Sequence, residues 1–326
     1  MNKLNSRSAS QNCLGLSLAL AFLIMLPVSC SREKKADISS AQMQDFVVHI
    51  AEYARQFDPD FIIIPQNGVE LCFNHTDSSS GFHNLYRSSI DGLGIEELFY
   101  NGDYSPDEER IRLLRKCQTS KKILVSEYVS NSTHLKDAYA KNQQEGFICF
   151  ARTAGNYHYQ QIPDTVPGEN SSDISTLADA QNFLYLISTD LFASKQAMLN
   201  AIKATNFDVI LIDLFFDGEA LDSTEIQQLK IKNNGGQRLV IAYVSVGSAE
   251  NFRYYWQDGW SLHHPSWLKK KYEGYEDEYW VEFWEKDWQD IIYGNDDSYV
   301  KRILNAGFDG AYLDNVEAYY FLYFNN

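Results

Sequence analysis

Short apolar runs recur along the chain and end at polar residues, which is the pattern of buried β-strands. Eight such runs predict strands, at residues 61–65, 90–95, 122–128, 146–151, 208–216, 238–246, 279–284 and 308–314. Helix-length segments with apolar residues three or four positions apart separate most of them, at residues 43–57, 106–117, 133–144, 224–233 and 297–305. Alternating strands and helices predict a parallel sheet with right-handed crossovers. Eight repeats favour a closed (β/α)8 TIM barrel over an open doubly wound α/β sheet.

The connection between the fourth and fifth predicted strands is much longer than the others. Residues 153–176 are rich in Pro, Gly, Ser, Asn and Asp, and residues 177–205 look helical. This segment is either an ordinary surface excursion or a seam between two halves of four strands each. We therefore predict a single domain over residues 41–326, with halves 41–152 and 206–326 joined by 153–205.

Residues 1–30 have the pattern of an export signal. Lys3 and Arg7 precede an apolar run of about fifteen residues, which is too short to span a bilayer comfortably and ends at a small residue before Cys30. The surroundings of Cys30 resemble a bacterial lipobox and predict a lipidated, membrane-anchored protein in the periplasm or at the cell surface. Pro27 stands where a lipobox carries an aliphatic residue, so simple secretion is the alternative. Residues 31–40 are predicted to form a short polar tether.

Charge and aromatic content narrow the range of ligands. The chain has 44 acidic and 28 basic residues, and its net charge of −16 argues against binding nucleic acid while permitting a cationic polymer. The 21 Tyr and 6 Trp suit a carbohydrate cleft, because aromatic faces stack on sugar rings while polar edges stay hydrated. Beyond Cys30, the cysteines Cys72, Cys117 and Cys149 lack metal-ligand spacing, and we expect no disulfide.

Carboxylates stand at or near the ends of most predicted strands. They are Glu96, Glu97, Glu127, Asp213, Glu250, Glu285 and Asp314. In a barrel the carboxyl ends of the strands carry the catalytic groups. Glycosidic cleavage needs one carboxylic acid and one carboxylate, and crowding of like charges raises the pKa of one of them. No histidine cluster accompanies these residues, so we expect neither a metal nor a cofactor.

Several motifs carry a family resemblance. They are NAGFDGAYLDN at 305–315, AYVSVGSAE at 242–250 followed by Arg253, the D-x-x-x-x-D strand at 208–213, WVEFWEKDW at 280–288, PQNGVEL at 65–71 and DGLGIE at 91–96. Together they resemble the endo-α-1,4-polygalactosaminidase family, glycoside hydrolase family 114, and its thermophile and archaeal relatives. The resemblance covers nearly all of residues 43–326.

The resemblance implies a glycosidase that cuts within an α-1,4-linked, galactosamine-containing polysaccharide. It places the catalytic pair at Asp314 and Glu96, with Glu97 as the alternative to Glu96, and we favour a retaining reaction with Asp314 as nucleophile and Glu96 as acid/base. Substrate-binding roles are expected for Asp213, Tyr243, Glu250, Arg253, Trp284, Asn67 and Glu127. We expect a monomer whose partners are the polysaccharide and, through the lipid, a membrane. The alternative is a polysaccharide-binding surface lipoprotein without catalysis.

The order of the motifs differs from that of the family. In the relatives, the D-x-x-x-x-D, AYxSxGxAE and GFDG-x-x-LD strands come first, and a helix like 43–57 and the PQNG and DG-x-G-x-E strands follow. Here the second group precedes the first. This predicts a circularly permuted barrel in which the strands containing Ile63 and Asp314 are neighbours, with the helix beginning near Met43 packed between them.

Overall fold

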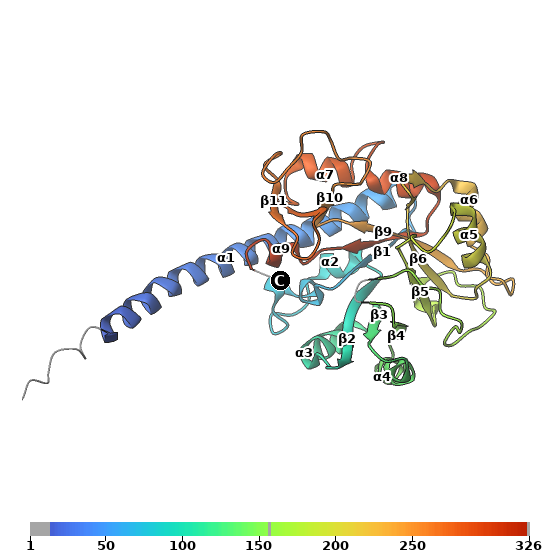
Figure 1. The fold of residues 1–326 in the computed structure, drawn as a ribbon, viewed down its shortest axis with the longest axis horizontal. Helices are drawn as coiled ribbons and strands as arrows, with labels where there is room; N and C mark the ends of the chain where they lie inside the picture. Colours follow the sequence, from blue (N-terminus) through green and yellow to red (C-terminus); the bar gives the residue numbers. More distant parts are fainter. Residues whose placement is uncertain (1–13, 156–157, 325–326) are drawn as a thin grey trace, which may run out of the picture.

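Parallel strands form the centre of the protein (Figure 1). The structure is a computed structural model that describes residues 14–155 and 158–324, with side chains from residue 32. In the described residues the central strands are β1 (Ile62–Pro65), β2 (Gly92–Tyr104), β3 (Lys122–Val129), β4 (Ile148–Arg152), β5 (Phe183–Leu186), β6 (Val209–Asp213), β9 (Leu239–Ser245) and β13 (Gly310–Asp314). They form two hydrogen-bonded groups, in the orders β5-β6-β9-β13-β1 and β2-β3-β4. A parallel bridge between Gln66 and Gly94 connects β1 to β2, and β4 packs beside β5. This mixed α/β architecture is consistent with a TIM-like fold.

Helices cover the outside of these strands. They are α1 (Leu14–Arg55), α2 (Asn84–Ser89), α3 (Glu108–Cys117), α4 (Leu135–Glu145), α5 (Lys195–Lys203), α6 (Ser223–Leu229), α7 (Lys286–Ile292), α8 (Tyr299–Ala306) and α9 (Ala318–Phe321). Each of the five predicted helices overlaps an observed one, and these are α1, α3, α4, α6 and α8. Local chemistry sets their ends: the Asp107 carboxylate accepts from the Arg110 backbone N–H at the start of α3, and Gly146 ends α4 with φ 80.

Smaller elements lie outside the central sheet. An antiparallel sheet has the order β10 (Ser248–Glu250), β12 (Glu278–Val281), β11 (Leu268–Lys271), and β7 (Phe215–Phe216) pairs with β8 (Glu219–Ala220). Short 3-10 helices are η1 (Val69–Cys72), η2 (Asn74–Thr76), η3 (Ser132–His134) and η4 (Leu177–Asp179). The cysteines Cys72, Cys117 and Cys149 are buried free thiols.

The predicted strand at 279–284 is wrong as a member of the central sheet. Its residues form β12, which pairs antiparallel with β10 and β11. The central strand that the sequence did not reveal is β5, within the segment that looked helical. β5 has only four residues and all are buried, so it shows neither an alternating pattern nor enough length to separate it from a helix. The helix of that segment, α5, begins only at Lys195.

The N-terminal helix is longer than predicted. Residues 31–40, expected as a tether, continue α1, and Ala36, Ser39 and Ser40 are buried. The Ser39 hydroxyl donates to the Tyr319 carbonyl at 2.8 Å, so packing against the domain begins before residue 41. The predicted lipidation concerns Cys30, whose side chain lies outside the described residues. In the part of the chain that the structure describes, no helix combines the length and apolar character that a membrane span requires.

β1 and β13 are neighbours, as predicted. They pair in parallel, with Ile63 opposite Ala311. Helix α1 packs against α2, which follows β1, and against α8, which precedes β13. The Phe46 ring in α1 lies 6.0 Å from the Phe283 ring. The helix beginning near Met43 therefore occupies the layer outside this strand pair, where the motif order placed it.

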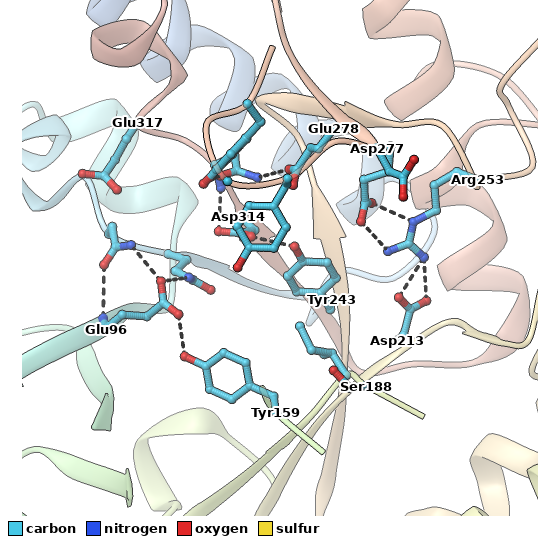
Figure 2. A pocket seen from close by; sticks show the side chains of 18 of the residues that line it. Glu96, Tyr159, Ser188, Asp213, Tyr243, Arg253, Asp277, Glu278, Asp314 and Glu317 are labelled. Carbon is cyan, nitrogen blue, oxygen red and sulfur yellow. Dashed lines mark hydrogen bonds and ion pairs between the residues drawn. The ribbon is translucent and has the colours of Figure 1, made fainter. Parts of the chain in front are cut away.

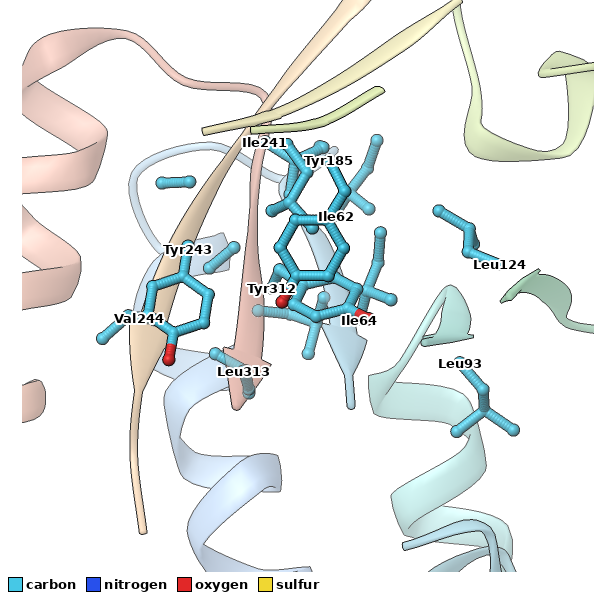
Figure 3. Packing of buried hydrophobic residues seen from close by; sticks show 14 of the residues in the cluster. Ile62, Ile64, Leu93, Leu124, Tyr185, Ile241, Tyr243, Val244, Tyr312 and Leu313 are labelled. Atoms are coloured by element: carbon cyan, nitrogen blue, oxygen red, sulfur yellow. The ribbon is translucent and has the colours of Figure 1, made fainter. Parts of the chain in front are cut away.

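Tyrosines fill the interior between the two groups of strands (Figure 3). The Tyr185 ring meets the Tyr312 ring edge-on at 5.5 Å and stacks on Tyr159 at 3.8 Å. A Cβ at Gly94 would lie 1.9 Å from the Tyr312 hydroxyl, so only glycine leaves room for this side chain. These packed rings, which we call the tyrosine floor (Tyr159, Tyr185 and Tyr312), lie beneath the carboxyl ends of the strands.

Candidate active site

A cavity of about 760 Å³ opens at the carboxyl ends of the central strands (Figure 2). β6 and β13 end at Asp213 and Asp314, Glu96 lies within β2, and Gln66 and Asn67 follow β1. All five of these side chains line the cavity. Because parallel strands deliver their carboxyl ends to one edge, residues far apart in the sequence meet here.

Asp314 is held by two donors. The Tyr243 hydroxyl donates to Oδ2 at 2.6 Å, and the Asn315 backbone N–H donates to Oδ1 at 2.7 Å. Burial, and then the charge of Glu96, raise the pKa of Asp314 to about 7. This carboxyl group therefore exchanges its proton near neutral pH.

Glu96 lies two strands away from Asp314, with the end of β1 between them. Its Oε2 accepts from Gln66 Nε2 at 2.5 Å and Asn67 Nδ2 at 3.3 Å, and its Oε1 accepts from the Tyr159 hydroxyl at 2.5 Å. Asn67 and Gly68 both have left-handed backbones, with φ of 59 and 55, which Asn and Gly adopt at little cost. This sharp turn after β1 brings Asn67 to Glu96.

Glu97, the alternative to Glu96, points away from the cavity. Its φ is 55, and the pairing of β2 with β3 shifts register between Glu96 and Asn101. Its carboxylate forms a buried ion pair with Arg152 at 3.0 Å. Burial, and then the charge of Glu96, raise the pKa of Glu97 to about 7. The geometry favours Glu96 as the residue that faces a substrate.

Arg253 is bonded to Asp213 and Glu250, two of the acids that were expected to bind substrate. Its guanidinium lies 2.7 Å from Asp213 and 2.7 Å from Glu250, and all three side chains are largely buried. Tyr243, Asp213, Glu250 and Arg253 all line the cavity. The negative charges of Asp213 and Glu250 are thus shared with an internal cation and are less available to an external one.

Glu278, which sequence reasoning missed, brings a further carboxyl group to the cavity from β12. It accepts from the Ser248 hydroxyl and from Asn315 Nδ2, the latter at 3.1 Å. Burial, and then the charge of Glu250, raise the pKa of Glu278 to about 8. Glu317 also lines the cavity, and burial followed by the charge of Glu70 raises its pKa to about 8. The acidic run at 273–278 was the only signal for Glu278.

Two residues expected to bind substrate do not line the cavity. Glu127 is buried and accepts from the Tyr100 backbone N–H at 3.0 Å and from Asn142 Nδ2 at 2.8 Å. It thereby stabilises the irregular part of β2 beyond Glu96, which is a structural role. Trp284 meets the Phe283 ring edge-on at 5.0 Å and packs against the core. Both residues lie near the end of a predicted strand. That position alone could not show whether their side chains would pack inside the protein or line the cavity.

Carboxyl groups gathered at the carboxyl ends of parallel strands, with tyrosines and one arginine around them, are compatible with the chemistry of the glycoside hydrolase class. In the described residues, no group of three or more His, Cys, Asp or Glu is placed to hold a metal ion.

Comparison with known proteins agrees with this class. Residues 169–326 match the model of the glycoside-hydrolase family GH114. The match confirms the family resemblance, while the motifs at 65–71 and 91–96 lie outside the matched segment.

Three uncharacterized proteins illustrate the relationship. One from Thermotoga maritima is 28% identical over 148 residues, covering 45% of this chain and 44% of the relative. One from Methanocaldococcus jannaschii is 32% identical over 152 residues, covering 46% and 41%, and one from Deinococcus radiodurans is 32% identical over 157 residues, covering 48% and 47%. The chain thus spans less than half the length of each of these relatives.

Proposed function

We propose that this protein is an endo-acting glycosidase that cleaves an α-1,4-linked, galactosamine-containing polysaccharide with Asp314 and Glu96. The match of residues 169–326 to the GH114 model supports glycosidic hydrolysis. The observation that carries the proposal is that Asp314 and Glu96 line one cavity, and that the charge of Glu96 contributes to raising the pKa of Asp314 to about 7. The test is incubation of the purified protein with polygalactosamine, followed by sizing of the products. Polymer that is bound but left intact would instead identify a binding protein.

Asp314 and Glu96 can supply the two groups that glycosidic cleavage needs, a nucleophile and an acid/base. Like charges this close disfavour ionisation of both groups at once, so Asp314 and Glu96 can share one proton. In a retaining reaction the ionised group attacks the anomeric carbon, while the acid protonates the departing glycosidic oxygen. A water molecule then releases the sugar, with the former acid acting as base. In the favoured assignment Asp314 attacks in its ionised form, which becomes populated as pH rises through about 7. Tyr243 and the Asn315 N–H hold it in place, and Glu96 transfers the proton.

The charge of the cavity supports a cationic substrate. Among the described lining residues the acids are Glu96, Asp213, Glu250, Glu273, Glu276, Asp277, Glu278, Asp314 and Glu317, and the only cation is Arg253. Arg253 is already bonded to two carboxylates. Glu278 has no cationic side chain within ion-pair distance in the described structure, so we assign it, rather than Asp213 or Glu250, to the substrate's ammonium group.

Removing the Glu278 charge should weaken binding of the free-amine polymer selectively. We expect Glu278→Gln to raise KM for deacetylated polymer about 10-fold, because one charge–charge contact is lost, and to leave KM for the N-acetylated polymer nearly unchanged. Since the pKa of Glu278 is raised to about 8, its carboxylate becomes more populated as pH rises from 6 to 8. The wild-type KM for the amine polymer should therefore fall over this range.

The control for this measurement is Asp296→Asn, which removes an exposed acid that does not line the cavity. It should leave both KM values unchanged. An equal change of KM on both polymers in Glu278→Gln would show that this carboxyl does not recognise the amine.

We also propose that the domain is a closed barrel with a circularly permuted chain. The central strands follow one another in chain order from β1 to β13, and β13 pairs with β1. A collinear comparison of two permuted chains can match only one segment, which accounts for alignments that cover under half of both partners. The family match begins at residue 169 and includes β5. The added connection therefore corresponds to residues 153–168 and is shorter than the predicted 153–205.

The permutation predicts that the chain can be rearranged without losing its fold. The contact between Ser39 and Tyr319 shows that the start of the domain lies beside its end. A protein with residues 153–326 first, then a short glycine-rich linker and residues 36–152, should unfold cooperatively, with a Tm within about 10 °C of the parent. Circular dichroism on heating measures this. A chain that shows no cooperative transition would contradict the permuted arrangement.

A further inference from the structure

Tyr159 reaches the cavity from the connection between β4 and β5, a segment that sequence reasoning treated only as a linker (Figure 2). Its ring is buried and stacks on Tyr185 with centroids 3.8 Å apart, and the Arg152 guanidinium lies 4.3 Å from its centroid. Its carbonyl accepts from the backbone N–H groups of Ile187 and Ser188, both at 3.0 Å. Backbone and ring are therefore both fixed, so the hydroxyl has a set position.

The Tyr159 hydroxyl connects two groups that can exchange donor and acceptor roles. It lies 2.5 Å from Glu96 Oε1 and 2.9 Å from Ser126 Oγ, and either hydroxyl of the latter pair can donate. When Glu96 is ionised, Ser126 donates to Tyr159 and Tyr159 donates to Glu96. When Glu96 is protonated, its O–H donates to Tyr159, which then donates to Ser126.

The other carboxylate oxygen of Glu96, Oε2, accepts hydrogen bonds from donors whose orientation is fixed. The side-chain amides of Gln66 and Asn67 both donate to Oε2, and the Tyr185 hydroxyl donates to Gln66 Oε1 at 2.8 Å, which fixes the orientation of the Gln66 amide. An amide N–H cannot accept a proton from a carboxylic acid. Oε1, which faces Tyr159, is therefore the oxygen that can carry the proton without losing a hydrogen bond.

We propose that Tyr159 is a positioning residue for Glu96, whose hydroxyl donates to the carboxylate and accepts from the carboxylic acid. Glu96 thereby keeps one orientation while it takes up and releases its proton. An acid/base group must change protonation state twice in each catalytic cycle, so a neighbour that accommodates both states avoids reorganisation of the site. This inference rests on the proposed function of Glu96.

The test is the Tyr159→Phe variant, which keeps the stacked ring and removes only the hydroxyl. We expect kcat on polygalactosamine to fall about 10–100-fold with KM little changed. The limb of the pH–rate profile that reports Glu96 should move upward by about one pH unit, because the ionised form loses a donor. The matched control is Tyr86→Phe: Tyr86 is equally buried, and its hydroxyl has no partner in the described structure. It should leave both kcat and the profile unchanged.

A second readout needs no turnover. In protein labelled with ¹³C at the glutamate carboxyl groups, the resonance assigned through its loss in Glu96→Gln should titrate at higher pH in Tyr159→Phe than in the wild type. An unchanged midpoint overturns the role of Tyr159, as does a fall in kcat with an unshifted pH profile. Failure of the wild-type protein to cleave any polymer, with the midpoint still shifted, overturns only the proposed function.

Discussion

Replacing Asp314 or Glu96 with its amide should reduce kcat by about 10³-fold or more while leaving the fold intact. Acid–base assistance alone contributes about 10²–10⁴-fold, and loss of the nucleophile removes the covalent route as well. Asparagine and glutamine keep the shape of each side chain and the hydrogen bonds that its carbonyl oxygen accepts. Steady-state kinetics on polygalactosamine would measure the loss, and thermal unfolding would verify that the fold is retained.

Glu285→Gln is the control for this experiment. Glu285 is another strand-end acid of the sequence, but it is exposed and does not line the cavity, so its amide should turn over at the wild-type rate. Near-normal kcat in Asp314→Asn would place the chemistry elsewhere on the cavity wall.

Azide would assign the two roles. If Asp314 is the nucleophile, azide added to Asp314→Ala with an activated substrate attacks in a single step and gives a glycosyl azide of inverted configuration. If Asp314 is the acid/base, the covalent intermediate still forms and azide gives the retained product. The configuration of the azide therefore decides between the assignments independently of rate.

The second large effect is expected on stability, at the ion pair between Asp208 and Lys232. Lys232 Nζ lies 2.9 Å from Asp208 Oδ1, and both side chains are fully buried. Asp208 also accepts from Asn170 Nδ2 and the Gln181 backbone N–H, so it ties the β4–β5 connection to the base of β6. Lys232→Met leaves a buried carboxylate without its cation and should lower the free energy of unfolding by about 3–5 kcal/mol.

Urea unfolding followed by tryptophan fluorescence measures this loss. The double variant Asp208→Leu with Lys232→Met should recover part of it, because apolar residues often replace a buried ion pair without a net cost. Lys286→Met breaks an exposed pair with Asp290 and should change stability by less than about 1 kcal/mol. A similarly small effect of Lys232→Met would show that this buried ion pair does not stabilise the fold.

The features that sequence could predict are those that depend on local pattern. Most central strands are buried apolar runs, and the carboxyl groups at the ends of β6 and β13 follow from the common direction of parallel strands. β5 escaped detection because four buried residues carry no periodicity. Glu278 comes from an inserted antiparallel strand, and Tyr159 comes from the long connection between β4 and β5. How those segments fold back onto the central strands determines how close these residues lie to Asp314 and Glu96. The bond between Arg253 and Asp213 joins residues 40 positions apart and has no local signature.

The two carboxyl groups proposed as the catalytic pair lie on different hydrogen-bonded groups of strands. Asp314 belongs to the five-stranded group and Glu96 to the three-stranded group, and the Gln66–Gly94 bridge lies where the groups meet. A glycosidase retains configuration when its carboxyl groups are about 5–5.5 Å apart and inverts it at about 6.5–9.5 Å. The Tyr312 side chain packs beneath Gly94, so its volume helps to set the spacing between the two groups of strands. Because Tyr312 does not line the cavity, a substitution there would change the separation of the two proposed catalytic carboxyl groups while the cavity lining stays the same.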